Sequence, residues 1–153
     1  MSSLDAEDRI TIVPFGSSAH IAAELTPMDD VGKKLIDGII DILDPAGTTN
    51  LWDGLKHGLN LLNGRITTLF CLTDGCPNVT PPRGHVDTLA HHLKTNAAYL
   101  TGVTIHTFGF GYSLDSALLM HLARVVFVHA LANALSVWAT QAALEIEVEV
   151  VGI

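Results

Sequence analysis

The chain has 153 residues, with 8 basic and 16 acidic side chains and a formal net charge of −8, and this length predicts one domain with a sizeable core. No run of basic residues interrupts the negative charge, so we expect no nucleic-acid partner, because duplex binding needs clustered lysine and arginine. Charged residues make up only 16% of the chain, below the usual fraction of about 25%. We therefore expect either that most elements are buried on two sides or that some apolar surface faces a partner.

Residues 1–9 are polar and acidic, and they lack the basic start and apolar stretch of a signal peptide. The chain has two cysteines, and this low number is typical of a reducing compartment. We therefore expect an intracellular, cytoplasmic protein. Residues 118–144 are apolar, but they include His121, Arg124, His129 and Asn133. Because these groups are costly inside a bilayer, we expect a buried helix and no membrane span.

The first third of the chain predicts a hairpin and then a helix. Residues 10–15 are rich in β-formers, a glycine–serine turn follows, and residues 19–25 can return as a second strand. Thr26 and Pro27 form a helix-start signal, a hydroxyl cap followed by proline at the first helical position. Apolar residues then recur every four positions and predict a core face, which consists of Val31, Leu35, Ile39 and Leu43 with Ile36 and Ile40 beside them.

The middle of the chain alternates between helical and strand patterns. Leu51, Leu55, Leu59 and Leu62 predict one face of a helix. Residues 66–72 are a continuous run of apolar and β-branched residues without alternation, which is typical of a central strand covered on both faces. Helical spacing returns over 86–97, and another strand pattern covers 103–110. This alternation predicts an α/β fold of three layers, with a doubly wound, mostly parallel sheet between helices.

The last third is unusual in its polar residues. Residues 114–140 predict one long helix, but its polar positions change direction between Arg124 and His129. We therefore divide the chain into a domain over 1–124 and a C-terminal helix and strand over 125–153, which would begin a second module. Residues 144–150 alternate strictly between apolar residues and glutamates, and this pattern predicts a half-exposed strand with three carboxylates on one face.

Two polar residues lie where ligands usually bind in such a sheet. Asp74 follows the strand predicted over 66–72. Thr49 lies in the loop before the helix predicted over 51–62, which precedes that strand in the sequence. Open α/β sheets bind ligands beyond the carboxyl ends of their strands. A hydroxyl and a carboxylate are hard oxygen ligands, so Thr49 and Asp74 are candidate ligands for Mg²⁺ or Mn²⁺.

Five stretches, taken in order over residues 8–123, resemble a von Willebrand factor type A domain. They are Asp8–Gly16, the loop Gly47–Leu55, Leu72–Gly75, Ile105–Gly111 and the helix after it. The resemblance implies a doubly wound sheet, a protein-binding role and a metal-ion-dependent adhesion site made by three loops and completed by a carboxylate of the partner. The threonine of that site falls on Thr49 and its aspartate falls on Asp74.

The sequence departs from this family in two places. The third loop of the metal site, Asp-x-Ser-x-Ser, has no counterpart, so we expect the family's first and central strand to be missing and any Mg²⁺ or Mn²⁺ to bind weakly. A second segment is missing near Arg124, and the tail Phe127–Val150 resembles the segment that follows this domain in fungal-type proteins with a second, β-rich module.

The missing central strand would leave unpaired backbone groups, which are costly when buried. Three outcomes are open: the hairpin closes against strand 66–72, strand 144–150 fills the gap, or the sheet edge stays open and the chain self-associates through it. We expect a non-enzymatic domain that binds a protein partner. The alternatives are a truncated fragment without function and a weak divalent-cation-binding domain.

Two further chemistries are weighed against simpler interpretations. Cys71 or Cys76 with a histidine would make a nucleophile pair, but the sequence places no histidine beside either, so one core thiol and one loop thiol are expected. A zinc site would use His85, His91 and His92. Adjacent helical residues point about 100° apart, so we expect these histidines to be surface residues instead.

Overall fold

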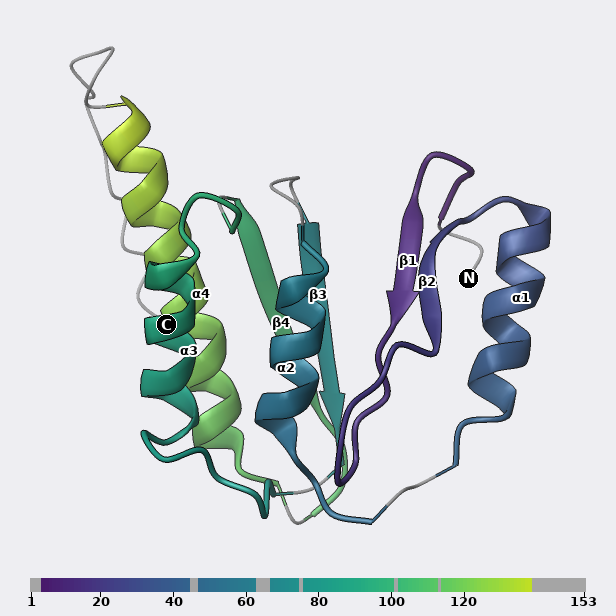
Figure 1. Cartoon of the computed structure of the whole chain (residues 1–153), viewed down its shortest axis with the longest axis horizontal. Helices are drawn as coiled ribbons and strands as arrows, with labels where there is room; N and C mark the ends of the chain where they lie inside the picture. Colours follow the sequence, from purple (N-terminus) through teal and green to yellow (C-terminus); the bar gives the residue numbers. More distant parts are fainter. Residues whose placement is uncertain are drawn as a thin grey trace, which may run out of the picture.

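The computed structural model describes residues 4–44, 47–62, 67–74, 76–100, 102–112 and 114–138, whose elements follow the predicted order (Figure 1). The strands are β1 (Arg9–Ile12), β2 (Ala23–Pro27), β3 (Thr67–Thr73) and β4 (Val103–Gly109). The helices are α1 (Asp30–Asp41), α2 (Leu51–Asn60), α3 (His85–Thr95) and α4 (Ser116–Trp138). The α/β fold class is therefore confirmed.

The predicted hairpin is present, but the helix after it begins later than expected. Pro27 is the last residue of β2, which pairs antiparallel with β1. Asp29 caps α1, since its Oδ1 accepts the backbone N–H groups of Val31 at 3.0 Å and Gly32 at 2.8 Å. The prediction from Thr26 and Pro27 was wrong, because an aspartate that accepts two N–H groups is a strong cap and proline is also at home in an edge strand.

Helix α1 buries only part of the predicted core face, since Ile36 and Ile39 pack in the cluster beside the hairpin. Ile36 is fully buried, and it packs with Met28 and Ala23 against β1 and β2. Val31 and Leu35, two members of the predicted core face, are 76% and 53% exposed. The hairpin is wide enough to cover only part of this apolar face.

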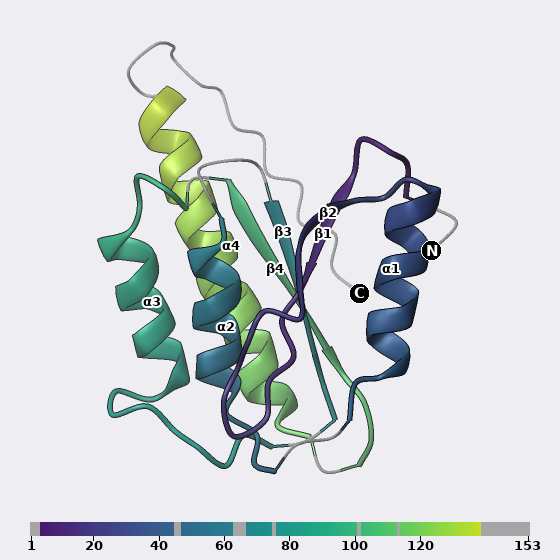
Figure 2. The same ribbon diagram turned by 45° about the vertical axis from the view of Figure 1, so that its right-hand side comes forward.

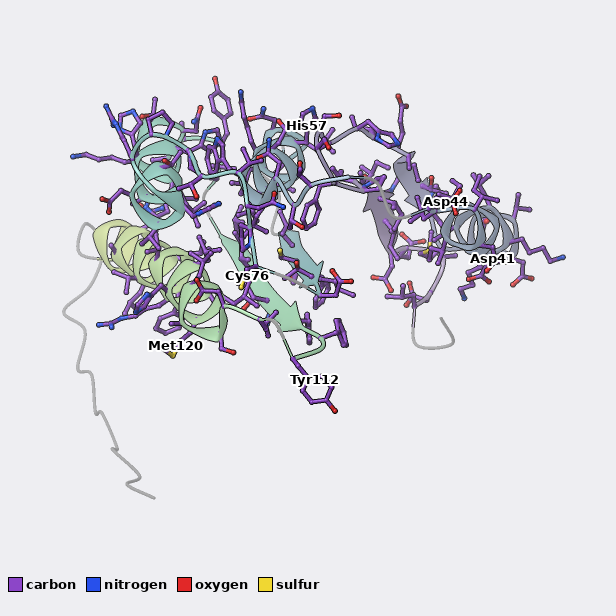
Figure 3. All side chains as sticks on the ribbon, turned by 90° about the horizontal axis from the view of Figure 1, so that it is seen from below. Asp41, Asp44, His57, Cys76, Tyr112 and Met120 are labelled. Carbon is purple, nitrogen blue, oxygen red and sulfur yellow. The ribbon has the colours of Figure 1, made fainter. Side chains whose placement is uncertain are left out.

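Strands β3 and β4 form a parallel pair in regular register, from Thr67 opposite Val103 to Thr73 opposite Gly109. Their alternate side chains, Cys71, Val103 and Ile105, are buried in the main core. Helices α2, α3 and α4 contribute the rest of that core through Leu51, Leu55, Leu59, Leu89, Leu93, Leu122 and Val126. The predicted leucine face of α2 is thus confirmed, and these three helices lie on one side of the β3–β4 sheet (Figures 2 and 3).

The other face of this sheet is open, contrary to the expected burial of both faces. Phe70 is 59% exposed, Leu72 is 55% exposed and Phe108 is 43% exposed. Among the residues that the structure describes, no helix packs on this face. The apolar run of β3 had predicted a strand between two helical layers, and only one layer is present in the described part.

The described strands form two sheets. β1 pairs with β2, and β3 pairs with β4, but no ladder between described strands joins β1 to β3. In Figures 1 and 2, β3 and β1 are the neighbouring strands of the two sheets. The hairpin therefore does not close against β3, which leaves two of the three predicted outcomes.

Helix α4 runs without interruption from Ser116 to Trp138. The change in polar direction between Arg124 and His129 therefore does not break the helix. Its stretch Ser116–Asn133 is long and apolar enough to cross a membrane, and 17% of that stretch is buried. Leu122 and Val126 are buried in the main core while most of the stretch is exposed, so the expectation of a buried helix holds for one face of α4 only. Length and composition alone are weak evidence for a span. The domain boundary at residue 124 falls inside α4 and remains a prediction, and strand 144–150 lies outside the described residues.

Candidate functional site

The loop before α2 and the loop after β3 meet at the end of the sheet where β3 and β4 stop (Figure 1). The backbone N–H of Thr49 donates to Oδ1 of Asn78 at 2.9 Å, and the backbone N–H of Asn78 donates to the carbonyl of Thr49 at 3.2 Å. Thr49 and Asp74 are thus brought to one rim, since Asn78 belongs to the loop that Asp74 begins. The sequence did not single out Asn78.

The hairpin turn reaches the same loop. Ser17 Oγ accepts the backbone N–H of Thr48 at 3.1 Å, and the carbonyl of Gly16 accepts the N–H of Asn50 at 2.8 Å. Asn50 also caps α2 by accepting the N–H of Asp53 at 3.2 Å. The bonds to Ser17 and Gly16 join loops far apart in the sequence, so they fix the rim as one unit.

A carboxylate of α2 completes the attachment of the hairpin. Oδ2 of Asp53 accepts the backbone N–H of Ala19 at 2.7 Å. Phe15 from the hairpin packs on Gly54, where an added Cβ would lie 2.7 Å from the ring carbon Cγ. Glycine at this position is therefore required for the hairpin to approach α2 closely.

The oxygen donors at the rim do not by themselves make a cation site. Asp74 is exposed and Thr49 is half-buried, and they offer at most two side-chain donors. No group of three histidine, cysteine, aspartate or glutamate side chains in the described part of the chain is placed to hold a metal ion. A Mg²⁺ ion prefers six oxygen ligands, so one held here would keep most of its waters. The assignment of Thr49 and Asp74 as metal ligands remains a prediction.

The two cysteines occupy the environments that the sequence predicted. Cys71 is 4% exposed in β3, and burial raises the pKa of its thiol to about 11. Cys76 is exposed in the loop after β3 (Figure 3). A thiol that stays protonated at neutral pH is a poor nucleophile, so Cys71 is suited to the core.

The three histidines considered for zinc lie in different surroundings. His85 is 7% exposed, and its Nε2 has no hydrogen-bond partner among the described residues. Burial is the main cause that lowers the pKa of His85. His92 makes an edge-to-face contact with Trp52 at 5.7 Å between ring centroids, and His91 is exposed. The expectation of surface residues holds for His91 and is wrong for His85.

The open face of the β3–β4 sheet carries a contiguous aromatic surface that the sequence did not reveal. Phe70 stacks on His106 at 5.5 Å between centroids and lies 5.9 Å from Phe108. Together with the exposed Leu72, these residues form what we call the open-face patch. Beside it, the hydroxyl of Thr104 donates to that of Thr68 at 3.0 Å, which gives the patch a polar edge.

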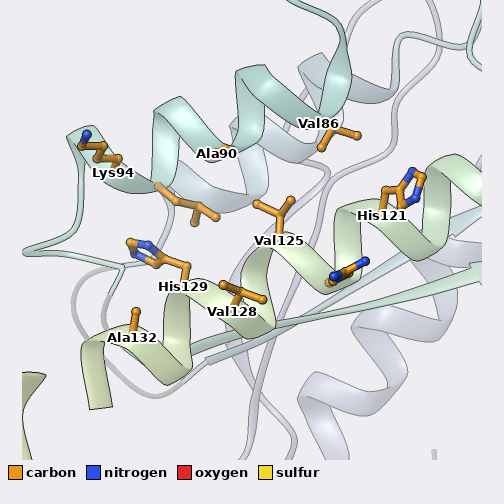
Figure 4. A pocket seen from close by; sticks show the side chains of 10 residues that line it. Val86, Ala90, Lys94, His121, Val125, Val128, His129 and Ala132 are labelled. Atoms are coloured by element: carbon orange, nitrogen blue, oxygen red, sulfur yellow. The ribbon is translucent and has the colours of Figure 1, made fainter. Parts of the chain in front are cut away.

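A groove of about 580 Å³ lies between α3 and α4 on the helical side (Figure 4). Its apolar lining includes Val86 and Val125, while Arg124, His121 and His129 contribute polar groups. The polar residues of α4 before and after the change of direction, His121 and Arg124 on one side and His129 on the other, therefore all line the same groove. The groove contains no carboxylate side chain among its lining residues.

Comparison with known proteins identifies the fold. The family model of the von Willebrand factor type A domain matches residues 1–126. No curated protein sequence matches the chain. Among solved structures, proximal thread matrix protein 1 from the mussel byssus is 21% identical, with a TM-score of 0.60, over 88% of this chain and 38% of that one.

A further structure of that mussel protein is described as having a zinc-occupied metal-ion-dependent adhesion motif. It is 22% identical with a TM-score of 0.58, over 83% of this chain and 35% of that chain. At this identity the likeness shows the fold alone. This chain thus spans little more than a third of the length of the mussel protein that it resembles.

Proposed function

The chain belongs to the von Willebrand factor type A domain family, and we propose that it is a protein-interaction module that binds a partner protein through the open-face patch. The observation that carries the proposal is the exposure of three neighbouring large apolar side chains, at 59% for Phe70, 55% for Leu72 and 43% for Phe108. Contiguous exposed apolar surface with a polar rim is typical of protein-binding sites.

The composition of the patch also favours a protein partner. Aromatic side chains are enriched at the centres of interfaces, where they contribute much of the binding energy. The aromatic rings are already in contact with one another, so little side-chain entropy is lost when a partner covers them. Rigid strands hold the patch, and this arrangement needs no metal ion at the Thr49–Asp74 rim.

No catalytic role is part of this proposal. Cys71 is buried in the core with a raised pKa, which disfavours a thiolate nucleophile. The rim loops use Ser17 and Asn78 to bond backbone groups of the neighbouring loop. These groups thus support the structure of the rim.

The test is site-specific photo-crosslinking from the patch in cells of the source organism. A photoreactive phenylalanine analogue replaces Phe70, and the same analogue replaces Tyr99 as a matched control, since Tyr99 is an exposed aromatic residue at 66% on the helical side. The proposal predicts a defined protein adduct from position 70 that is absent from position 99. The same adducts from both positions, or none from position 70, would overturn it.

A further inference from the structure

Strand β3 has the composition of an interior strand, yet it has one described partner. It pairs with β4 along all of Thr67–Thr73 without a shift in register. No strand of the described part pairs with its other edge. Edge strands are usually protected by a charged residue, a proline or a bulge, and the sequence of β3, TTLFCLT, has no charge and no proline. This edge is therefore suited to pairing with another strand.

Strand β1 presents a second edge, which differs from that of β3 because β1 contains the charged Arg9 and a register shift between Ile10 and Ile12. It pairs with β2 on one side, and the described residues supply no strand on the other side. In Figures 1 and 2, β1 and β3 point in the same direction as the inner strands of the two sheets. The bonds from Ala19 to Asp53 and from Asn50 to Gly16 hold the hairpin to α2, so the two edges keep a fixed relation.

A strand that pairs with β3 needs two different faces. Next to Cys71 it would face the helical layer, where apolar side chains are favoured. Next to Phe70 it would lie on the open face, where charged side chains can stay in water. Residues 144–150 of this chain, LEIEVEV, alternate four apolar residues with three glutamates and match this requirement.

The position of α4 decides which copy of the chain supplies that segment. In Figures 1 and 2, α4 lies beyond β4, on the side of that strand away from β1. Residues 139–143 alone separate Trp138 from the segment, and such a connection spans at most about 20 Å. Crossing β4 and β3 takes about 10 Å of that length, and the distance from α4 to β4 takes a further part of it. A second molecule has no such restriction.

We propose that residues 144–150 of a second copy of this chain pair with the edge of β3 that no described strand covers, between β3 and β1, so that two copies exchange strands reciprocally. Strand addition of this kind obtains affinity from backbone hydrogen bonds and specificity from the alternating side chains. The proposal rests on the strand edges and is independent of the partner of the open-face patch.

The buried thiol of Cys71 offers a direct test by disulfide formation. With Cys76→Ser as the background, Ile146→Cys and Val148→Cys place a thiol at apolar positions, and Glu145→Cys and Glu147→Cys are the matched controls. Neighbouring strands lie about 4.8 Å apart, within the range for a disulfide, and only side chains on the same face can meet. After mild oxidation, the purified full-length chains are compared on non-reducing gels, and the linked peptides are identified by mass spectrometry.

The proposal predicts a covalent dimer linked through Cys71 in at least one apolar-position variant, at least fivefold more abundant than in either glutamate-position variant. It also predicts that the unmodified chain sediments as a dimer and that Ile146→Lys with Val148→Lys, in an otherwise complete chain, sediments as a monomer. A disulfide within one chain, equal dimer in both sets of variants, no disulfide to Cys71, or an unchanged dimer in the lysine variant would each overturn it.

Discussion

The backbone N–H of Ala19 donates a 2.7 Å hydrogen bond to Oδ2 of Asp53, across 34 residues of sequence. This bond ties the hairpin of β1 and β2 to the first turn of α2. Because no ladder between described strands joins the two sheets, attachments of this kind must take its place. The same end of α2 supports the loop of Thr49, so one carboxylate links the N-terminal hairpin to the candidate site.

Asp53→Ala should therefore destabilise the whole chain. Ala19 is 9% exposed, and a buried N–H without an acceptor costs about 1–3 kcal/mol. Asp53→Asn keeps an acceptor oxygen and should cost less than half as much, while the exposed Asp37→Ala on α1 is the control. Urea unfolding measures these free energies. Equal losses for Asp53→Ala and Asp37→Ala would show that the bond contributes nothing.

Cation binding at the rim should be weak. A Mn²⁺ ion held by Thr49 and Asp74 would keep most of its water ligands, so we predict half-saturation at about 1 mM or above. Asp74→Ala should abolish this binding, because it removes the one carboxylate of the pair. Water-proton relaxation during a Mn²⁺ titration measures both quantities. Tight binding, or binding that survives Asp74→Ala, would show that other ligands are involved.

Acid should destabilise the fold through His85. Burial lowers the pKa of this histidine in the native state, so the unfolded chain binds the proton more readily once the pH falls below about 6.5. Stability contributed by neutral His85 is intact above that pH and is lost below it, by at most about 1.4 kcal/mol at pH 5.5. Unfolding at pH 7.5 and 5.5 should show a smaller loss in His85→Gln than in the exposed control His91→Gln. Identical losses would mean that His85 does not contribute.

The cysteines should differ sharply toward a thiol reagent. Exposed Cys76 should react at neutral pH in the native protein, whereas Cys71 should react only after unfolding, because it is buried and its pKa is raised to about 11. Mass spectrometry after labelling counts the modified thiols, and Cys76→Ser isolates the slow site. Rapid labelling of Cys71 in the folded state would reopen the possibility of a reactive core thiol.

Strong periodicity made most of the fold predictable. The leucine spacing of α2 and the apolar run of β3 predicted elements within two residues of the observed bounds. The sequence did not predict the start of α1 or its buried face, because two interpretations competed at each. Thr26-Pro27 and Asp29 both resemble helix starts, and only the length of β2 decides between them. The two adjacent apolar stripes of α1 gave no reason to prefer Ile36 over Leu35.

The site was predictable only in part, because its key contacts are distant in sequence. Thr49 and Asp74 were expected at one rim, and the structure brings their loops together. The bonds between Thr49 and Asn78 could not be foreseen, since they join loops 29 residues apart. The open-face patch was missed for another reason. An apolar run in a strand is normally covered on both sides, and nothing local to Phe70 indicates that one side is bare.

The central claim is that the domain binds a protein partner through the open-face patch. The most direct measurement is the dissociation constant of the partner identified by crosslinking, determined by calorimetry for the wild type, Phe70→Ser and Tyr99→Ser. Removal of a central aromatic residue typically costs about 2 kcal/mol or more, so Phe70→Ser should weaken binding by about thirtyfold or more. Tyr99→Ser should leave the affinity within about twofold of the wild type. Equal affinities for Phe70→Ser and the wild type would contradict the account.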